Sequence, residues 1–329
     1  MTTQSFQRRY KRLRRLVDHR LMSLVRTDDS RDLSEGCRYV LSAGGKRVRA
    51  VLVLLSSEAV GGTTANALHA AAAAEVMHNF TLVHDDIMDH ASSRRGRPTV
   101  HVKWNVNYAL LVGDVLLGLA YRSLLSTRSD HLRRMVGLFT SGLHEVCEGQ
   151  ALDLRYEQDR RVTLDQYFAM IEKKTARLFS MSTELGGLAG GGTPQHVSAL
   201  RTFGHYLGRA FQVQDDLLDI VAEQQQFGKR IGGDIVEGKK TFLLLSALER
   251  ARGREKEALQ RIMSRRHRAG KGTVARIAGI YTQTGAIDAA RTHIQRDTQK
   301  AATALDTLPR NSATAMLHWF SGYLLTRVS

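Results

Sequence analysis

The chain has 329 residues, of which three are proline and two are cysteine, and it carries a formal net charge of +16. The long runs between the prolines are rich in good helix formers, and no segment shows a sustained strand alternation. The two cysteines lack the spacing of a zinc site or of a disulfide framework. We therefore expect an all-α protein of the reducing cytoplasm.

The N-terminal segment, residues 1–26, is basic and lacks the apolar stretch of a secretory signal. Its cluster RRYKRLRR at residues 8–15 fits a solvated helix face, and it also fits contact with an acidic membrane surface. The most apolar stretch, residues 108–121, contains Asp114 and is shorter than the roughly 20 residues of a membrane span. We expect a soluble protein, and both interpretations of the basic cluster stay open.

Polar or glycine-rich breaks punctuate the helical pattern, and each is short enough to connect two helices. None resembles an interdomain linker, so we predict a single domain over residues 1–329 that includes the basic segment 1–26. The expected breaks are residues 42–45, 61–64, 92–98, 126–130, 190–194, 224–233 and 269–272.

The sequence GGKRVRA places basic side chains directly after two glycines, at an expected helix start. Backbone N–H groups, the helix dipole and the cationic side chains would favour an anion together at such a point. A helix start with solvated charge has the same composition, so this segment alone does not decide between the two. The basic residues are Lys46, Arg47 and Arg49.

Two DDxxD clusters, about 130 residues apart, each follow an apolar helical pattern. The first and last aspartates of each cluster are four residues apart, so their carboxylates share one helix face. Like charges about 4 Å apart repel by about 4 kcal/mol at an effective dielectric constant near 20. The pairing predicts a hard divalent cation such as Mg²⁺ as the compensating charge. The clusters are Asp85, Asp86 and Asp89, and Asp215, Asp216 and Asp219.

Basic residues follow both clusters. Arg94 and Arg95 stand in SSRRGRP, where glycine and proline predict a tight loop that can return guanidinium groups toward a metal-bound phosphate. Further along the chain, IEKKTARLF and FGKRIGGDIVEGKKTF add Lys174, Thr175, Lys229 and Lys239. Acids that hold metal and bases that hold phosphate alternate, which is the pairing that diphosphate chemistry requires.

From GGKRVRA to its C-terminus the chain resembles the trans-isoprenyl diphosphate synthases, also called polyprenyl synthetases. The family's blocks occur in the family's order: GGKRVRA, HDDIMDHASSRRGRPTVH, EGQALD, EKKTARLF, GRAFQVQDDLLD and GGDIVEGKKTF. The resemblance implies a single large helical bundle of the isoprenoid synthase type, with a central cavity flanked by two DDxxD helices. It also implies a homodimer, and three Mg²⁺ ions in each active site.

The resemblance further implies the roles of individual residues. Metal would be held by Asp85, Asp89 and Asp215, with support from Asp86, Asp216, Asp219, Gln150 and Asp153. The allylic diphosphate would be held by Arg94, Lys174, Lys229 and Lys239, and isopentenyl diphosphate by Lys46, Arg49, His78 and Arg95. Catalysis would use Lys174 together with Thr175 and Gln212, the last two of which would point oxygens at the developing allylic cation.

The implied reaction joins isopentenyl diphosphate to an allylic diphosphate of five, ten or fifteen carbons, head to tail. In the family, the residues four and five positions before the first aspartate help to set the floor for the growing chain, and here they are Thr81 and Phe80. A phenylalanine at the deeper position resembles short-chain synthases. We expect geranylgeranyl diphosphate, with farnesyl or longer products as the alternatives and an ordinary core role for Phe80 as the competing interpretation.

Three other functions compete with this one. A class I terpene cyclase would have one DDxxD helix, but it would not need a second such cluster or the GGKR site. A non-catalytic synthase subunit would lose the ligands, which this chain keeps. A nucleic-acid-binding protein would explain the charge and leave both acidic clusters unexplained, and we expect no nucleic-acid partner.

Overall fold

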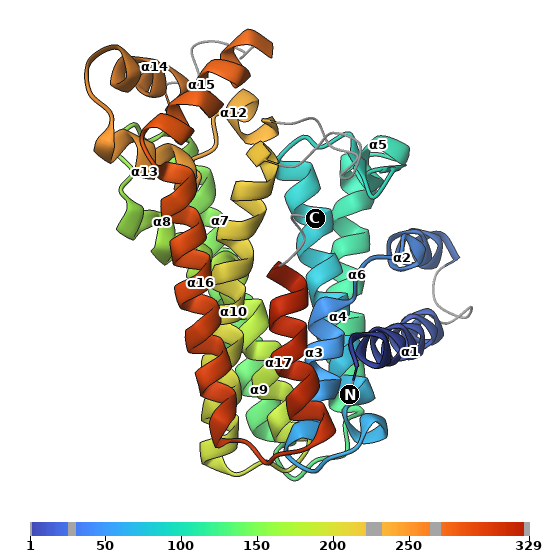
Figure 1. Ribbon diagram of the computed structural model, residues 1–329. Coiled ribbons are helices and arrows are strands. Elements are labelled where there is room, and N and C mark those ends of the chain that lie inside the picture. The colour runs from blue at the N-terminus through green and yellow to red at the C-terminus, as the bar shows by residue number, and fades with distance from the viewer. Residues whose placement is uncertain (1, 26–30, 222–231, 264–270, 326–329) are drawn as a thin grey trace. The chain divides into compact units, whose positions relative to one another are not determined.

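A computed structural model describes residues 2–25, 31–221, 232–263 and 271–325 (Figure 1). Within these ranges the regular structure is helical, apart from one antiparallel hairpin of β1 (Ser93–Arg94) and β2 (Arg97–Pro98). The prediction of an all-α fold is confirmed. The hairpin occupies the break expected over residues 92–98, where the sequence predicted only a tight loop.

The chain divides into two compact units. Unit 1 comprises residues 1–143, 178–202 and 305–319, and unit 2 comprises residues 144–177, 203–304 and 320–329. Most boundaries fall inside helices rather than in linkers, and the one between residues 304 and 305 falls where α16 meets η2. That the two units form one domain over residues 1–329 stays a prediction.

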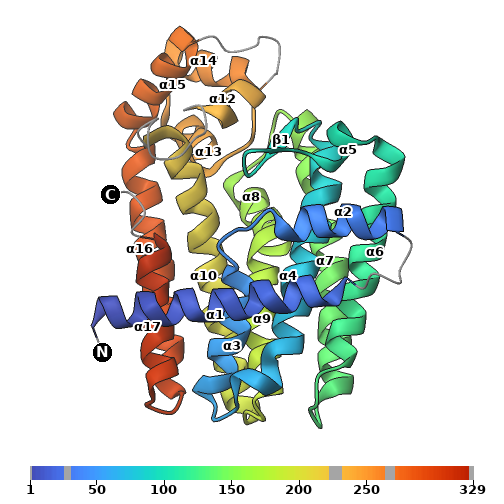
Figure 2. The ribbon, with the colours of Figure 1, turned by 90° about the vertical axis from the view of Figure 1, so that its right-hand side faces the viewer.

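Unit 1 is organised around a long central helix, α4, which contacts both α3 and α6. Residues Ala70 to Ala74 of α4 are fully buried, because their small side chains let the neighbouring helices approach closely. The basic N-terminal helix α1 lies against α3 and α4 (Figure 2). The helices that begin in this unit are α1 (Thr3–Leu24), α2 (Arg31–Ser42), α3 (Val48–Ala59), α4 (Thr64–Met88), α5 (Val100–Lys103), α6 (Val106–Leu125), α7 (Leu132–Gln158), α10 (Pro194–Val221), η2 (Leu305–Thr307) and α17 (Ser312–Leu325).

Local sequence explains where α4 begins and ends. The Thr63 side chain caps its N-terminus by accepting a hydrogen bond from the Asn66 backbone N–H at 3.2 Å. The alanine-rich body has high helix propensity. The helix ends at Met88 with Asp89 as its C-cap, and the next residue, His90, has a positive φ of 51°. The first DDxxD cluster therefore occupies the last turn of the helix.

Helix α6 contains the most apolar stretch of the sequence, residues 108–121. It extends over 20 residues, and it is the one helix of the described residues that is long and apolar enough to cross a membrane. Its Ala109, Val112 and Leu116 are fully buried, and the helix packs against α4 and α2. A core helix meets the same criterion of length and composition. Leu110 and Leu111 of this helix are exposed.

Unit 2 contains the second DDxxD cluster, at the C-terminal end of α10. Helix α13 packs against α8, α14, α15 and α16. A π-helical turn, η1, interrupts the segment between α8 and α9, and it contains Lys174 and Thr175. The remaining elements are α8 (Leu164–Ile171), η1 (Glu172–Ala176), α9 (Arg177–Ala189), α12 (Gly233–Glu237), α13 (Phe242–Arg250), α14 (Gly253–Met263), α15 (Lys271–Gln283) and α16 (Ala286–Ala304), of which α9 runs on into unit 1.

Candidate active site

The three aspartates of the first cluster differ in their exposure to solvent. Asp89 is exposed and Asp85 is half-buried, whereas Asp86 is buried. The Asp86 carboxylate accepts from Nε of Arg94 at 2.8 Å and lies 2.7 Å from Nη2 of the same guanidinium. Burial raises the pKa of Asp86, and the Arg94 pairing opposes that rise. Asp86 therefore anchors the hairpin through Arg94, and its support of a metal site stays a prediction.

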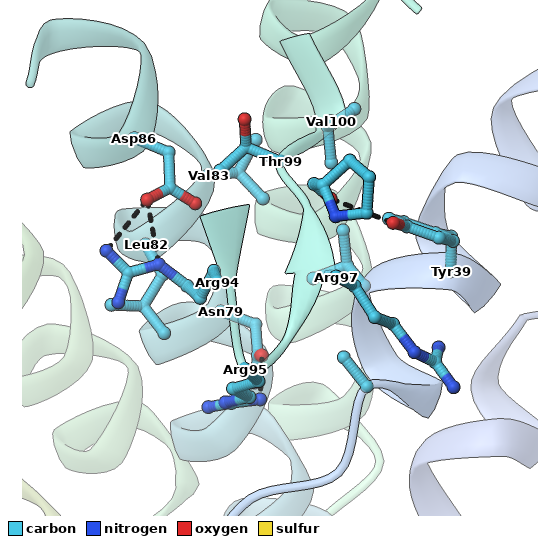
Figure 3. A pocket seen from close by; sticks show the side chains of 13 residues that line it. Tyr39, Asn79, Leu82, Val83, Asp86, Arg94, Arg95, Arg97, Thr99 and Val100 are labelled. Carbon is cyan, nitrogen blue, oxygen red and sulfur yellow. Dashed lines mark hydrogen bonds and ion pairs between the residues drawn. The ribbon is translucent and has the colours of Figure 1, made fainter. Parts of the chain in front are cut away.

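The hairpin folds back over α4 and encloses a small cavity (Figure 3). Tyr39 closes one side, and its hydroxyl donates to the Pro98 carbonyl at 2.8 Å. Asn79, Asp86 and Arg95 line the cavity from α4 and from the hairpin. The close-up shows Arg94 turned toward Asp86 and Arg95 turned toward Asn79. The two adjacent arginines thus contact different residues in the C-terminal part of α4.

Arg95 lies over the glycines of GGKR. Its guanidinium donates to the Gly44 carbonyl, and it lies 3.4 Å from the Asn79 amide oxygen. A Cβ at Gly45, where φ is +128°, would lie 3.0 Å from Cζ of Arg95. Only glycine permits this backbone conformation together with such a close approach. Arg95 thereby joins the hairpin to the GGKR segment, and their shared role in binding a diphosphate stays a prediction.

Arg49 and His78, which the family resemblance assigns to the same diphosphate as Arg95, contact each other. Nη1 of Arg49 lies 3.1 Å from Nε2 of His78. Burial lowers the pKa of Arg49 to about 10, and burial followed by the neighbouring arginines lowers the pKa of His78 well below its usual value. His78 is therefore neutral. Since Arg49 donates to Nε2, the proton of the imidazole resides on Nδ1.

Two hydrogen-bond donors, one on Arg49 and one on His78, indicate an anionic ligand. Nε of Arg49 and Nδ1 of His78 are buried and make no hydrogen bond within the part of the chain that the structure describes. A buried N–H without a partner costs about 1–3 kcal/mol, which a bound phosphate oxygen would recover. The predicted second diphosphate site is thus supported by unsatisfied donors as well as by charge.

Arg47 differs from its neighbours in GGKR because it points inward. It donates to the Asp18 carboxylate at 2.8 Å, to Glu75 at 3.3 Å and to the Leu41 carbonyl at 2.6 Å. Its backbone is left-handed, with φ 52°, and its side chain does not cap α3. Lys46 is exposed. Arg47 fixes the loop, and its side chain makes no capping hydrogen bond to the start of α3.

The two residues expected to set product length lie on different sides of α4. Phe80 is buried, and its ring meets the imidazole of His84 edge to face at 4.7 Å. His84 in turn packs on Gly113 of α6, where a Cβ would lie 2.2 Å from Nε2 of the imidazole. Thr81 is half-buried, and its hydroxyl donates to the carbonyl of His78 at 2.9 Å.

The second cluster, in unit 2, repeats the pattern of the first. Asp215 is exposed, while its neighbour Asp216 is buried. Asp216 accepts from the Tyr167 hydroxyl at 2.6 Å, from the Phe242 backbone N–H at 2.9 Å and from the Gln212 amide at 3.0 Å. Burial raises the pKa of Asp216 to about 6 and the pKa of Tyr167 well above its usual value. Asp216 is thus a buried acceptor, whereas Asp215 faces outward.

Helix α12 brings a fourth carboxylate, that of Asp234, to this cluster. The Asp219 carboxylate accepts from the backbone N–H of Asp234 at 3.0 Å. Burial, followed by Asp216 and Asp219, raises the pKa of Asp234 to about 8. Lys239 lies 3.9 Å from Asp234 and 2.8 Å from Glu237. Lys229, the other lysine expected here, lies outside the described residues.

The π-helical turn connects to both α7 and α10. Lys174 makes an ion pair with Asp153 at 2.6 Å. The Thr175 hydroxyl donates to the amide oxygen of Gln212 at 2.8 Å. Gln150 is buried, and neither its amide nitrogen nor its oxygen has a hydrogen-bond partner among the described residues. Lys174, Thr175 and Gln212 are thus brought together in one unit, while Asp153 contacts the lysine directly.

The residues of both clusters fit a hard divalent cation. The carboxylates occupy the C-terminal turns of α4 and α10, where the helix dipole disfavours negative charge and favours a cation. Within the described ranges, no three His, Cys, Asp or Glu side chains converge to hold a metal by themselves. Magnesium commonly binds in such a partial set, because it retains waters and takes its other ligands from phosphate.

Several functional candidates escaped the sequence reasoning. Glu75 is the buried partner of Arg47, and Asn79 contacts Arg95. Tyr167 and Asp234 belong to the second cluster. For Asn79 the signal was its place beside His78, and for Asp234 it was its place in the GGDIVEGKK block. Nothing local distinguished Tyr167.

The fold is all-α, and each unit carries an aspartate cluster at the C-terminal end of a helix with basic side chains nearby. Residues 30–280 match the polyprenyl synthetase family. The short chain isoprenyl diphosphate synthase of Methanothermobacter thermautotrophicus is 37% identical over 313 residues, which are 95% of each chain. The chain therefore belongs to the polyprenyl synthetase family, and it is a prenyltransferase.

Solved structures agree with this assignment. A geranylgeranyl pyrophosphate synthetase from Pyrococcus horikoshii superposes with a TM-score of 0.92 at 36% identity and covers 98% of both chains. A polyprenyl synthase from Caulobacter crescentus, complexed with calcium and isoprenyl diphosphate, superposes with a TM-score of 0.90 at 28% identity. It covers 100% of this chain and 98% of its own. The isoprenoid synthase fold is confirmed, and the family uses Mg²⁺.

Proposed function

We propose that this prenyltransferase condenses isopentenyl diphosphate with an allylic diphosphate and makes geranylgeranyl diphosphate as its main product. One observation carries the proposal. Arg49 and His78 each have a buried hydrogen-bond donor without a partner among the described residues, and the charge of Arg95 acts on both side chains. A chain elongation needs a place for a second diphosphate, whereas a cyclisation does not. The product length is supported by Phe80 and by the name of the Pyrococcus horikoshii relative.

The residues divide the work between ionisation and attack. Asp85, Asp89 and Asp215 would hold Mg²⁺, three ions in each active site, and the metal supplies positive charge that stabilises diphosphate as a leaving group. Lys174 and Lys239 would bind the same diphosphate. Thr175 and Gln212 would offer oxygens to the allylic cation that remains when the carbon–oxygen bond breaks. The double bond of isopentenyl diphosphate then attacks, and a proton is lost to the departed diphosphate.

The test uses purified protein with magnesium, labelled isopentenyl diphosphate and each of the C5, C10 and C15 allylic diphosphates. We expect elongation that stops at C20. Accumulation of C15 or of longer chains would correct the length while leaving the reaction intact. If no starter were elongated, the proposal would fail. Asp85→Ala should abolish turnover and leave the far-ultraviolet circular dichroism unchanged, because Asp85 lies at the end of its helix.

We also propose that the protein acts as a homodimer in the cytoplasm. The outer face of α6, with Leu110 and Leu111 exposed, supports a second copy as its partner. Light scattering after gel filtration should give twice the mass of the chain. A monomer of undiminished activity would contradict the dimer.

We also propose that the basic face of helix α1 contacts acidic membranes. The face of α1 that carries Arg8, Lys11, Arg12 and Arg15 is exposed, while Tyr10, Leu13 and Val17 are buried. Each cation near an anionic bilayer contributes about 1 kcal/mol, and salt screens the attraction. We expect low-salt sedimentation with phosphatidylserine vesicles that is lost when these four residues are changed to glutamine. The matched control changes Arg128, Arg133, Arg201 and Arg310, which are exposed elsewhere in unit 1.

A further inference from the structure

A chain of hydrogen bonds in unit 2 leads from a buried phenol to the threonine of the π-helical turn. The Tyr167 hydroxyl donates to one oxygen of Asp216, and the Gln212 amide nitrogen donates to the other. The Gln212 amide oxygen accepts from the Thr175 hydroxyl at 2.8 Å. Four side chains from α8, α10 and η1 are thus linked in series.

The donor and acceptor roles along this chain are fixed by its buried end. The Phe242 backbone N–H can only donate, and it reaches the same Asp216 oxygen as Tyr167, at 2.9 Å. The carboxylate therefore receives hydrogen bonds and presents its second oxygen to Gln212 at 3.0 Å. If the Gln212 amide were reversed, two oxygens would face one another at that distance, which is unfavourable.

The orientation of Gln212 determines that of Thr175. Because the amide nitrogen faces Asp216, the amide oxygen faces the threonine, and the hydroxyl proton of Thr175 must lie on that hydrogen bond. The lone pairs of the hydroxyl oxygen are then directed elsewhere. With the opposite polarity, the hydroxyl would accept from Gln212 and would turn its proton outward.

We propose that Tyr167 is a positioning residue for the ionisation step, because it fixes Asp216 and, through Gln212, directs the lone pairs of Thr175 toward the allylic cation. This inference rests on the proposed function of the same site. Tyr167 is buried, with 2% of its surface exposed. It acts through three side chains, and its ring is held by Phe168 and Phe242, whose centroids lie 5.4 Å and 6.3 Å away.

Tyr167→Phe keeps the ring and removes only the hydroxyl. We expect kcat to fall by about tenfold, the usual effect of losing one hydrogen bond to a charged group, while KM for isopentenyl diphosphate stays unchanged. Tyr281→Phe is the matched control, since Tyr281 is also buried and is affected by the charges of Asp216 and Asp219. No hydrogen bond of Tyr281 to Asp216 is present, and kcat should stay near that of the unmodified enzyme.

A double-mutant cycle separates positioning from general stability. In a Thr175→Val background, Tyr167→Phe should change kcat less than about twofold, because the group through which it acts is gone. In a Thr175→Ser background, which keeps the hydroxyl, the loss should reappear. Additive losses in the valine background would overturn the inference, because they would show that Tyr167 acts on the fold alone.

A second measurement does not depend on turnover. With the glutamine side chains labelled with ¹⁵N, the Gln212 amide signal should shift in Tyr167→Phe and stay in place in Tyr281→Phe. An unchanged Gln212 signal in Tyr167→Phe would also overturn the inference. If the unmodified enzyme elongated no starter, the proposed function would fail, and this spectrum would still report whether Tyr167 orients Gln212.

Discussion

Gly149 of α7 lies directly against the backbone of Lys174. A Cβ at Gly149 would come within 2.4 Å of the Lys174 nitrogen and within 2.7 Å of its Cα. Both are backbone atoms of the π-helical turn, so neither can move aside as a flexible side chain would. One turn further along α7, Asp153 makes the ion pair with the same lysine. Helix α7 thus fixes both the backbone and the ammonium group of Lys174.

Gly149→Ala should therefore displace the π-helical turn. We expect a loss of kcat of about tenfold or more, since a misplacement of about 1 Å near the reacting atoms can cost a hundredfold. Steady-state kinetics with an allylic diphosphate would measure it. The control is Gly137→Ala on the same helix, where a Cβ would meet nothing within 4 Å. Gly137→Ala should raise helix stability by up to about 1 kcal/mol and leave kcat unchanged.

Phe80 offers a test of product length. Phe80→Ala should yield longer prenyl diphosphates, because it removes the ring that meets His84 and leaves space at that point of α4. Phe80→Leu should lengthen the products less, in proportion to the smaller loss of volume. Chromatography of the dephosphorylated products would give the distribution. The same distribution in all three proteins would place the floor elsewhere.

Adjacent aspartates of the second cluster should behave in opposite ways. Asp216→Ala leaves the hydroxyl of Tyr167 and the N–H of Phe242 without their acceptor, at about 1–3 kcal/mol for each buried group. The melting temperature should fall by several degrees. Asp215→Ala, at an exposed position, should leave the melting temperature almost unchanged and abolish magnesium-dependent turnover. Equal losses of stability would contradict the division of roles.

His78 should make stability depend on pH. Burial and four arginines lower its pKa in the folded chain, so the unfolded chain binds the additional proton near pH 6.5 and below. Stability then rises with pH wherever the unfolded state holds more protons, and acidification through pH 6.5 destabilises the fold. Urea unfolding between about pH 5.5 and 7.5 should show a steeper dependence than in His78→Asn. Parallel curves for the two proteins would contradict a neutral, buried imidazole.

Helical periodicity and break residues predicted much of the fold correctly. The expected breaks at residues 42–45, 61–64, 126–130 and 190–194 each fall at or between helix ends. The breaks expected over 224–233 and 269–272 lie largely outside the described residues. The β1–β2 hairpin was not foreseen, because two residues in each strand are too few to show an alternating pattern.

The sequence by itself determined the chemistry of this protein: which residues could hold metal and phosphate, and their spacing on helix faces. Only the tertiary structure determined which of two adjacent residues is buried and which is exposed. Asp86 is buried while Asp85 is half-exposed, and Arg47 turns inward beside the exposed Lys46. Successive residues on a helix point about 100° apart, so the identical side chains of Asp85 and Asp86 face different surroundings. Those surroundings come from segments distant in the sequence, as Asp216 shows by meeting Tyr167 and Phe242.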